Sequence, residues 1–187
     1  HLHRQGQALY VGISSYSQEL TLKAAAILKE ERVPLFIHQP NYNMFNRWIE
    51  NGLLDTLDEL GTGCIVFSPL AQGLLTSRYL NGIPEGARAN QGGSLKASAE
   101  NEELLGRIRA LNVIAERRGQ TLAQMAIAWT LRDPRVTSSL IGASSVAQLE
   151  NSLGALKGLE FSAEELAEID QYAHDGGTDW WKSSTSL

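Results

Sequence analysis

The segment LIGASSVAQLEN, residues 140–151, passes from an apolar run into a helical pattern through a turn of small residues. Such a turn leaves the first backbone amides of the next helix uncovered by side chains. Those N–H groups and the positive end of the helix dipole form a site that suits an anion such as a phosphate. The alternative is a local role, in which Ser145 and Gln148 only cap the helix. This segment alone leaves both interpretations open.

Three further apolar runs resemble the one that ends in this turn. The four runs are ALYVGI (8–13), LFIH (35–38), GCIVFS (63–68) and SSLIGA (138–143). None alternates strictly between apolar and polar residues, so we expect strands that are buried on both faces of a parallel sheet. Helical patterns occupy 17–31, 45–60, 100–117 and 121–131, and two more follow Ser145 and Ser162. The chain therefore predicts an α/β fold built of βα units, with residues 1–187 in a single domain.

Local signals refine the helices and one long connection. Three pairs have the spacing of a capping box, namely Thr121/Gln124, Ser145/Gln148 and Ser162/Glu165. An apolar stripe after Thr121, made of Leu122, Met125, Ala126 and Trp129, is typical of a core helix. Residues 77–98 are rich in Gly, Asn, Ser and Pro and are too long for a tight connection, so we expect them to cover a site or to be disordered.

The composition excludes several classes of partner. The chain has 187 residues, of which 43% are hydrophobic and 20% charged, and its formal net charge is −5. Its basic residues are scattered, which argues against binding to nucleic acid or to an anionic membrane. No apolar run approaches the roughly 20 residues of a membrane span. The lone Cys64 lies in an apolar run, which indicates a buried thiol in a reducing compartment, and we expect a cytoplasmic protein.

Small or polar residues follow every expected strand. They are Ser14 with Ser15, Gln39 with Asn41, Ser68 with Pro69, and Gly142 to Ser144. Parallel strands bring their carboxyl ends to one edge of the sheet, and ligands of parallel α/β proteins bind at that edge. Arg78 and Arg88 in the long connection are candidates to close over an anion held there.

Six motifs, taken in order, identify a family resemblance that covers nearly the whole chain. They are GISSYS (12–17), HQPNYNMFNR (38–47), FSPLAQGLLTSRY (67–79), GIPEGAR (82–88), QTLAQMAIAWTL (120–131) and IGASSVAQLEN (141–151). Together they resemble the carboxyl-terminal half of an aldo-keto reductase, in the branch of the potassium-channel β subunits and the bacterial glyceraldehyde-3-phosphate-type reductases. The resemblance implies a (β/α)8 TIM barrel, of which this chain holds the last four βα units, a half barrel, and a C-terminal helix.

The resemblance also implies a cofactor, NADPH, bound across the carboxyl-terminal face. By this resemblance Ser14 and Gln39 contact the nicotinamide carboxamide, and Phe67 stacks on the nicotinamide ring. The loop that lines the pyrophosphate consists of Ser68, Pro69, Leu70, Ala71, Gln72 and Gly73. Arg78 and Arg88 belong to the segment that folds over the cofactor. The adenosine end is assigned to Gly142, Ser144, Gln148, Glu150 and Asn151, and the 2′-phosphate to Ser144 with Arg88.

Several of these residues have a second interpretation. Phe67 fits an ordinary core position as well as a stacking one, and Gln148 fits the capping box, the cofactor or both. Many members of the family have Arg at the position of Gln148, which leaves the preference for NADPH over NADH open. Glu150 and Asn151 face the adenine only if the helix begins near Ser145. Trp180 and Trp181 fit either a substrate pocket or packing anchors.

The sequence departs from the family in its catalytic residues. The family's Asp, Tyr, Lys and His tetrad belongs to the first four strands, which this sequence does not contain. Tyr42 has no Lys or Asp at a spacing that would lower its pKa, Tyr79 lies in the long connection, and His38 is expected to point away from the ligand. We therefore expect the chain to be part of a longer reductase of small-molecule carbonyl substrates, and to be inactive alone.

Three functions remain open on the sequence. The first is the cofactor-binding half of an NADPH-dependent reductase of aldehydes or ketones. The second is an NADPH-binding, redox-sensing module of the channel β-subunit kind, and the third is a half barrel that serves assembly alone. Four strands of a barrel leave two unpaired edges, so we expect either a missing amino-terminal half or a homo-oligomer to complete the fold. Substrate identity is not specified by these residues.

Overall fold

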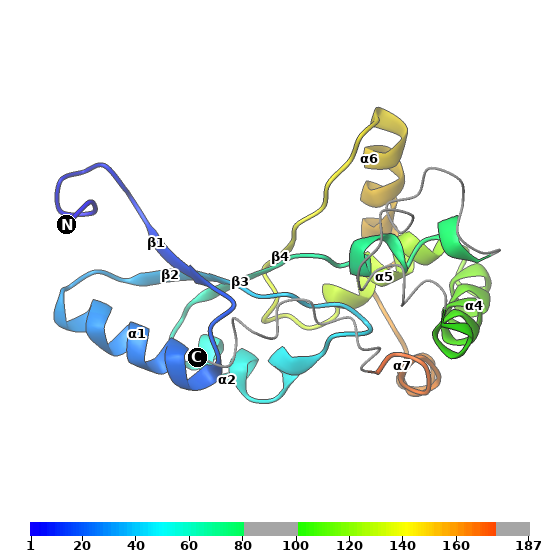
Figure 1. The fold of residues 1–187 in the computed structure, drawn as a ribbon, viewed down its shortest axis with the longest axis horizontal. Helices are drawn as coiled ribbons and strands as arrows, with labels where there is room; N and C mark the ends of the chain where they lie inside the picture. Colours follow the sequence, from blue (N-terminus) through cyan, green and yellow to red (C-terminus); the bar gives the residue numbers. More distant parts are fainter. Residues whose placement is uncertain (81–100, 175–187) are drawn as a thin grey trace.

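The computed structural model describes residues 1–80 and 101–174 and contains one parallel sheet with helices around it (Figure 1). The strands are β1 (Val11–Ser14), β2 (Leu35–Gln39), β3 (Gly63–Val66) and β4 (Ser138–Ser139), in the order β1-β2-β3-β4. The helices are α1 (Gln18–Glu30), α2 (Leu53–Glu59), α4 (Glu102–Arg117), α5 (Leu122–Thr130), α6 (Val146–Leu153) and α7 (Ala163–Asp170). Short 3-10 helices are η1 (Trp48–Glu50), η2 (Ala71–Gly73), η3 (Ser77–Tyr79) and η5 (Gly154–Lys157). The predicted α/β order of elements is confirmed.

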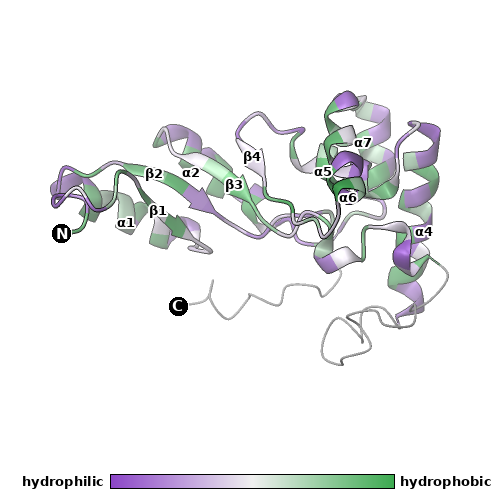
Figure 2. Cartoon of the chain, turned by 90° about the horizontal axis from the view of Figure 1, so that it is seen from above, coloured by the Kyte–Doolittle hydropathy of each residue, from purple (hydrophilic) through white to green (hydrophobic). Residues whose placement is uncertain are grey.

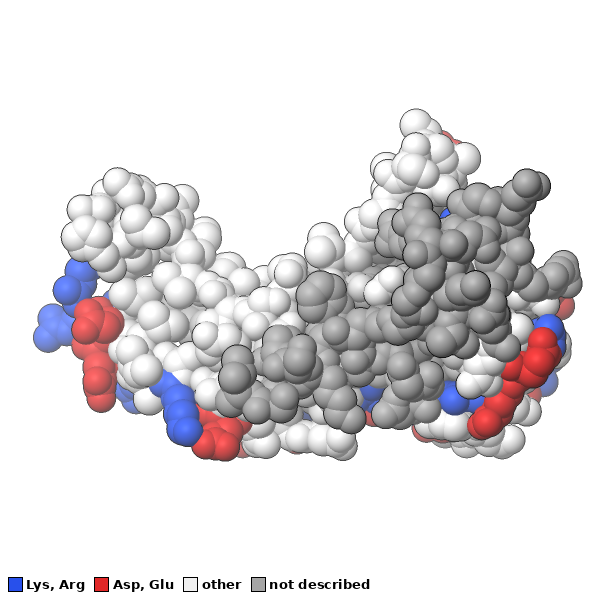
Figure 3. Space-filling view, in the orientation of Figure 1, with Lys and Arg blue, Asp and Glu red and all other residues white. Residues whose placement is uncertain are grey.

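Among the described residues, helices cover the sheet on one face only (Figure 1). Helices α1 and α2 lie along one side of the strands, and α4 to α7 gather beyond their carboxyl ends (Figure 1). The other side forms a hollow between the amino-terminal segment and α6, and the described residues visible in this hollow are not Lys, Arg, Asp or Glu (Figure 3). Along β3 the burial alternates, because Cys64 and Val66 are buried whereas Ile65 is only half-buried. The expectation of strands buried on both faces is therefore wrong for this chain.

Several apolar side chains on or near the strands remain exposed to solvent. Strands β1, β2 and β3 are largely hydrophobic (Figure 2), yet Tyr10 and Phe36 near the amino ends of β1 and β2 are 64% and 49% exposed. Their rings stack with centroids 4.3 Å apart. Such a pair shields each ring from water only partly. The strand end of the molecule therefore keeps a large apolar surface in contact with solvent.

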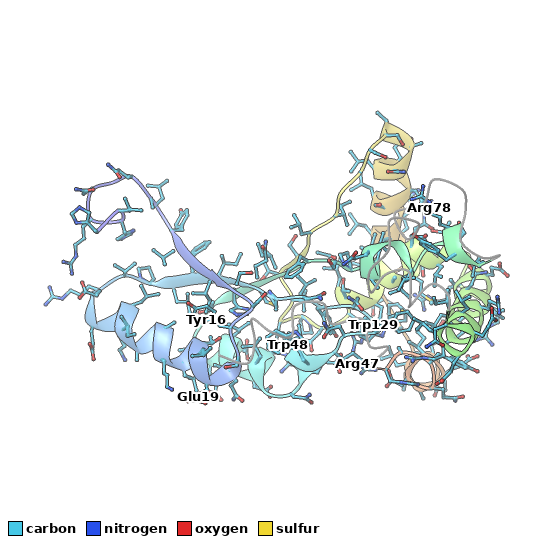
Figure 4. The ribbon with its side chains drawn as sticks, viewed as in Figure 1. Tyr16, Glu19, Arg47, Trp48, Arg78 and Trp129 are labelled. Carbon is cyan, nitrogen blue, oxygen red and sulfur yellow. The ribbon has the colours of Figure 1, made fainter. Side chains whose placement is uncertain are left out.

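The larger core cluster of the described residues lies mainly at the helical end. It joins α2, α4 and α5 with the segment after β2, and its largest fully buried side chains include Trp129, Tyr42, Tyr79 and Phe45. The Arg132 guanidinium lies 3.6 Å from the centre of the Trp129 ring, and that of Arg47 lies 5.1 Å from it. Figure 4 shows Arg47 beside Trp129 at this end. The apolar stripe of Leu122, Met125, Ala126 and Trp129 that the sequence assigned to a core helix is thus confirmed as core.

Two predicted elements differ most in length from the structure. The helix expected over 45–60 is divided into η1 and α2, because Gly52 between them has φ +94°, a conformation that favours glycine. The strand expected over 138–143 is reduced to Ser138–Ser139, which pair with Ile65 and Val66 of β3. In the described chain β4 pairs on one side only; the Leu140 N–H still bonds the Val66 carbonyl of β3 at 2.7 Å, although Leu140 itself is exposed.

The helix starts follow the sequence closely. Ser17 caps α1 by accepting a hydrogen bond from the Leu20 N–H, as expected for a helix beginning there. Thr121/Gln124 and Ser162/Glu165 each form a complete capping box. The third pair, Ser145/Gln148, does not form a complete box, and its geometry bears on the candidate site.

Candidate functional site

The carboxyl ends of β1 and β2 are joined through the main chain of Gln39. The Gln39 carbonyl accepts a hydrogen bond from the Ser14 hydroxyl at 2.7 Å and another from the Ser15 N–H at 3.1 Å. Ser14 and Gln39 also face each other in the strand register. The structure therefore brings together the two residues that the family resemblance assigned to the carboxamide. The Ser14 hydroxyl is exposed and keeps its lone pairs for a donor from a ligand.

The turn after β3 has an unusual backbone. Ser68, Ala71 and Gln72 all have positive φ values, of +57°, +46° and +57°, and Gly73 follows at +101°. A succession of left-handed and right-handed residues points several amides toward one concave side, and such concavities bind anions. Within the turn the Ala71 N–H bonds the Ser68 carbonyl at 3.0 Å, and the Gly73 N–H bonds that of Leu70 at 2.8 Å. This geometry suits the predicted pyrophosphate-lining loop.

A buried amide connects this turn to the segment after β2. Asn43 is 1% exposed, and its Nδ2 donates to the Ser68 carbonyl at 3.0 Å and to the Asn41 Oδ1 at 3.3 Å. Its Oδ1 accepts from the Phe45 N–H at 2.9 Å. The segments after β2 and β3 also form a parallel bridge between Asn41 and Phe67. The polar ends of β1, β2 and β3 therefore form one connected edge, on which the half-buried Phe67 sits.

The segment after β4 is a separate part of the candidate site. Gly142, Ser144, Gln148 and Glu150 are exposed, as is Asn151, whose carbonyl accepts from the Gln124 Nε2 at 3.0 Å. The Gln148 Oε1 accepts hydrogen bonds from both the N–H and the hydroxyl of Ser144, each at 2.9 Å. Ser145 caps α6 by accepting from the Gln148 N–H at 3.3 Å. The expected capping box at this helix is therefore wrong, because the Gln148 side chain bonds Ser144 instead of the Ser145 backbone.

Of the two arginines predicted to close over an anion, the structure describes Arg78 but not Arg88. Arg78 belongs to η3, its side chain is exposed, and Figure 4 places it on the side of the molecule where α6 stands. Arg88 lies outside the described residues, and so do Trp180 and Trp181. Of the predicted site, the described part thus consists of a connected group on β1 to β3 and a second group around α6 and η3.

His38 occupies a position behind the connected edge. It is fully buried, and its Nε2 accepts a hydrogen bond from the Tyr16 N–H at 3.2 Å. Burial lowers its pKa to about 4, so the imidazole is neutral near pH 7. The sequence placed His38 away from the ligand but assigned it no partner. The sequence shows only a histidine inside an apolar strand next to Gln39, which does not identify Tyr16 as its partner.

The described side chains do not provide a tuned proton donor near this edge. The Tyr42 hydroxyl donates to Glu50 Oε1 at 2.6 Å and accepts from Arg132 at 2.7 Å, and burial raises its pKa above the usual value. Tyr79 is also buried in the core. Cys64 is fully buried, and burial raises the pKa of its thiol to about 12. These groups are structural, as a buried thiolate or phenolate would be strongly unfavourable.

Comparison with known families identifies the class of protein. Residues 1–174 match the model of the aldo/keto reductase family. The chain therefore belongs to that family, as the motifs had indicated.

No helix in the two described ranges is long and apolar enough to cross a membrane. No group of three or more His, Cys, Asp or Glu residues there is placed to hold a metal ion.

Individual relatives narrow the comparison. Two curated proteins named L-glyceraldehyde 3-phosphate reductase, from Escherichia coli O157:H7 and Escherichia coli strain K12, are 53% and 52% identical over 190 residues. The match covers 99% of this chain but 55% of each relative. The chain thus spans about half the length of the curated relatives it matches.

Solved structures give the same family. The thermostable aldo-keto reductase Tm1743, solved with the inhibitor epalrestat, matches with a TM-score of 0.66 and 26% identity, over 91% of this chain and 51% of its own. The holo form of the aldo-keto reductase AKR11C1 from Bacillus halodurans matches with a TM-score of 0.68 and 25% identity, over 93% and 53%. These neighbours support a fold of the TIM-barrel family for this parallel sheet.

Proposed function

We propose that this chain is the cofactor-binding half of an NADPH-dependent reductase of small aldehydes or ketones. The observation that carries this proposal is the connected polar edge, in which Ser14 bonds Gln39 and the segment that follows Gln39 bonds Phe67 and Ser68. The relatives' names support a reductase, and their length supports a barrel that a second half completes. In this proposal the four strands form a half barrel.

The residues of the connected edge fit one end of a dinucleotide. The Ser14 hydroxyl, already donating to Gln39, offers its lone pairs to a carboxamide N–H, and the Gln39 side chain offers both a donor and an acceptor. The turn from Ser68 to Gly73 would present its remaining backbone amides to a pyrophosphate, since the Ala71 and Gly73 N–H groups are bonded within the turn. When bound, NADPH supplies the hydride. The chain's own residues would hold and orient the nicotinamide at the carboxyl edge of the sheet.

The adenosine end fits less directly. Both donors of Ser144 are already bound to the Gln148 Oε1, so a 2′-phosphate at Ser144 requires this side chain to move away. The free-energy cost of that displacement reduces the difference in affinity between NADPH and NADH. In this proposal the preference for NADPH is therefore modest in a complete reductase that carries these residues.

Catalysis by this chain alone is not part of the proposal. Reduction of a carbonyl needs a proton donor at the developing alkoxide. Tyr42 cannot take this role because its hydroxyl is buried between Glu50 and Arg132. The chain alone is expected to bind NADPH weakly or not at all, and to show no turnover. The missing half would supply the donor and most of the substrate pocket.

NADPH titration of the ¹⁵N-labelled chain, followed by NMR, tests the proposed binding site. We expect the amide signals of Ser14, Gln39 and Ser68 to shift, while amides of α7 stay in place. Gln39→Leu should weaken binding about five- to tenfold, since it removes one hydrogen-bonding group at the ligand. Gln171→Leu is the matched control, because Gln171 is exposed and follows α7. Shifts confined to regions other than this edge would contradict the proposed site.

Activity assays address the second part of the proposal. NADPH oxidation with a small aldehyde should equal background for this chain and rise when a complete barrel is assayed. Turnover by the chain alone would show that a proton donor is present among its own residues. A complete barrel that binds NADPH but does not oxidise it with an aldehyde would favour the redox-sensing alternative.

A further inference from the structure

Two serines of the connected edge hold a backbone conformation that favours glycine. Ser15 follows β1 and Ser68 follows β3, and each has φ +57°. A side chain at such a position carries a free-energy cost, so contacts around it must hold the conformation in place. Both serines lie next to atoms that the proposed function assigns to the dinucleotide.

The turn at Ser15 is bound on both of its sides by β2. Before and within the turn, the Gln39 carbonyl accepts from the Ser14 hydroxyl and the Ser15 N–H. After it, the Tyr16 N–H donates to the His38 Nε2 at 3.2 Å. Figure 4 shows Tyr16 at the carboxyl end of β1, close to the start of α1. The left-handed residue is therefore fixed by hydrogen bonds to two neighbouring residues of one strand.

His38 can accept the hydrogen bond from the Tyr16 N–H, but it is buried too deeply to contact a ligand. Its imidazole is fully buried, and in the described chain its Nδ1 has no hydrogen-bond partner. Because Nε2 accepts the Tyr16 N–H, the ring is neutral and its proton is on Nδ1. Since successive strand residues point to opposite faces, His38 faces away from the side on which Gln39 lies.

The turn at Ser68 is held in a similar way. The buried Asn43, on the segment after β2, donates from Nδ2 to the Ser68 carbonyl at 3.0 Å. Its Oδ1 is occupied by the Phe45 N–H at 2.9 Å, which fixes the orientation of the amide. Thus a buried polar side chain from β2 or its following segment contacts the main chain at each left-handed turn.

We propose that His38 and Asn43 are positioning residues, which hold the left-handed turns at Ser15 and Ser68 so that the connected edge keeps the shape that receives the nicotinamide end of NADPH. Neither residue touches the cofactor in this proposal. That His38 and Asn43 hold the two turns concerns this chain's own conformation. That the held turns receive NADPH rests on the proposed function, so the two claims are measured separately.

Amide hydrogen exchange of the full chain, measured by NMR, tests the role of His38. His38→Leu removes the acceptor, and we expect exchange of the Tyr16 amide to become at least tenfold faster. His38→Gln restores an acceptor on a flexible side chain and should keep this rate within about threefold of the parent. His174→Leu is the matched control, since it removes an exposed imidazole. The Thr137 amide, bound to the Cys64 carbonyl, should be unchanged throughout.

A measurement on the parent chain covers the case in which His38→Leu fails to fold. A hydrogen bond between two nitrogens transmits a scalar coupling, so the Tyr16 amide nitrogen and the His38 Nε2 should show one. The His38 ¹⁵N shifts should also report an unprotonated Nε2. Absence of the coupling, or Tyr16 exchange that is the same in His38→Leu and the parent, overturns the role of His38.

Asn43→Asp tests the second turn, because it keeps the acceptor for the Phe45 N–H and loses the donor to the Ser68 carbonyl. We expect the Ser68 and Leu70 amide signals to shift and broaden. Asn51→Asp, at an exposed position after η1, is the matched control. Signals of the Ser68 turn that move no more in Asn43→Asp than in the control would overturn the role of Asn43.

NADPH titration then connects the turns to binding. We expect the NADPH-induced shift of the Ser14 amide to fall at least fivefold in His38→Leu at equal NADPH concentration, and to return in His38→Gln. If Tyr16 exchange changes but this shift does not, the positioning role is wrong. If NADPH shifts no signal even in the parent, the proposed function fails, while the exchange rates still decide whether His38 holds the turn.

Discussion

The two ends of the molecule differ in how completely their apolar side chains are covered. At the helical end, Trp129 and Ile108 are fully buried between α4, α5 and the segment after β2. At the strand end, Tyr10 and Phe36 stack on each other but remain about half exposed. Because burial of apolar area is the main source of stability, the helical end holds most of it. The candidate site lies where the two ends meet.

Helices α5 and α6 show the same contrast at the level of single elements. Seven residues of α5, from Leu122 to Thr130, are buried. In α6 no residue is buried, and Val146, at its first position, is 72% exposed. Both helices begin at a capping residue, so the difference comes from packing and not from the local sequence signal. A helix pattern therefore indicates a helix, but not whether a neighbour covers it.

The largest effect should come from removing the central side chain of the helical core. Trp129→Ala is expected to lower the free energy of unfolding by about 3–5 kcal/mol, because it leaves a large cavity beneath Arg132. Phe36→Ala, at the strand end, should cost less than about 1 kcal/mol, as half of its ring is already in water. Urea unfolding followed by circular dichroism gives both values. Equal losses in the two variants would contradict the comparison.

A pH effect of somewhat smaller size should come from the one buried histidine of the strand end. Burial holds the folded-state pKa of His38 at about 4, against 6.5 for the free group. Between these values the unfolded chain binds the proton more readily, so the free energy of unfolding should fall as the pH drops from 6.5 toward 4. The full difference corresponds to about 3 kcal/mol.

Urea unfolding of the parent and of His38→Gln at a series of pH values isolates this effect. The variant should lose the slope between pH 6.5 and 4, whereas His174→Leu should keep it. Arginine partners lower the pKa of carboxylates such as Glu50 despite burial. Protonation of these groups lowers the free energy of unfolding only as the pH falls through their ordinary pKa and below, and it does so equally in both proteins. Parallel pH curves for the parent and His38→Gln would contradict a buried neutral imidazole.

The smallest effect should distinguish the two capping residues. Thr121→Ala removes a complete capping box from a buried helix and should cost about 1 kcal/mol. Ser145→Ala removes one hydrogen bond from the exposed α6, and its cost to global unfolding should be about 0.5 kcal/mol or less. Thermal unfolding measures both. A larger loss in Ser145→Ala would mean that α6 is coupled more strongly to the core than its exposure indicates.

The sequence predicted the features that depend on local pattern. Ser17, Thr121 and Ser162 cap helices where expected, because a hydroxyl and its target amide lie within one turn of chain. The order of strands and helices followed from apolar runs and their spacing. The grouping of Ser14, Gln39 and Ser68 followed from the rule that parallel strands end at one edge, and their hydrogen bonds confirm that these three ends adjoin.

The features that the sequence did not predict depend on distant contacts or on backbone conformation. Nothing local tells that His38 accepts from Tyr16, since the two residues are 22 positions apart. Ser15 and Ser68 carry no signal for a left-handed φ, which glycine would have given. The Gln148 side chain can reach Ser145, three positions back, or Ser144, four positions back, and only the structure decides for Ser144. The assignments to NADPH remain proposals.

The free edges of the sheet have a consequence for handling the chain. In the described residues β1 and β4 each pair with one neighbour, so the outer side of the four-residue β1, and a shorter stretch at the two-residue β4, can offer main-chain donors and acceptors to another strand. Such edges recruit strands from other molecules, and concentrated solutions of this chain should gel or precipitate through main-chain pairing before its core unfolds.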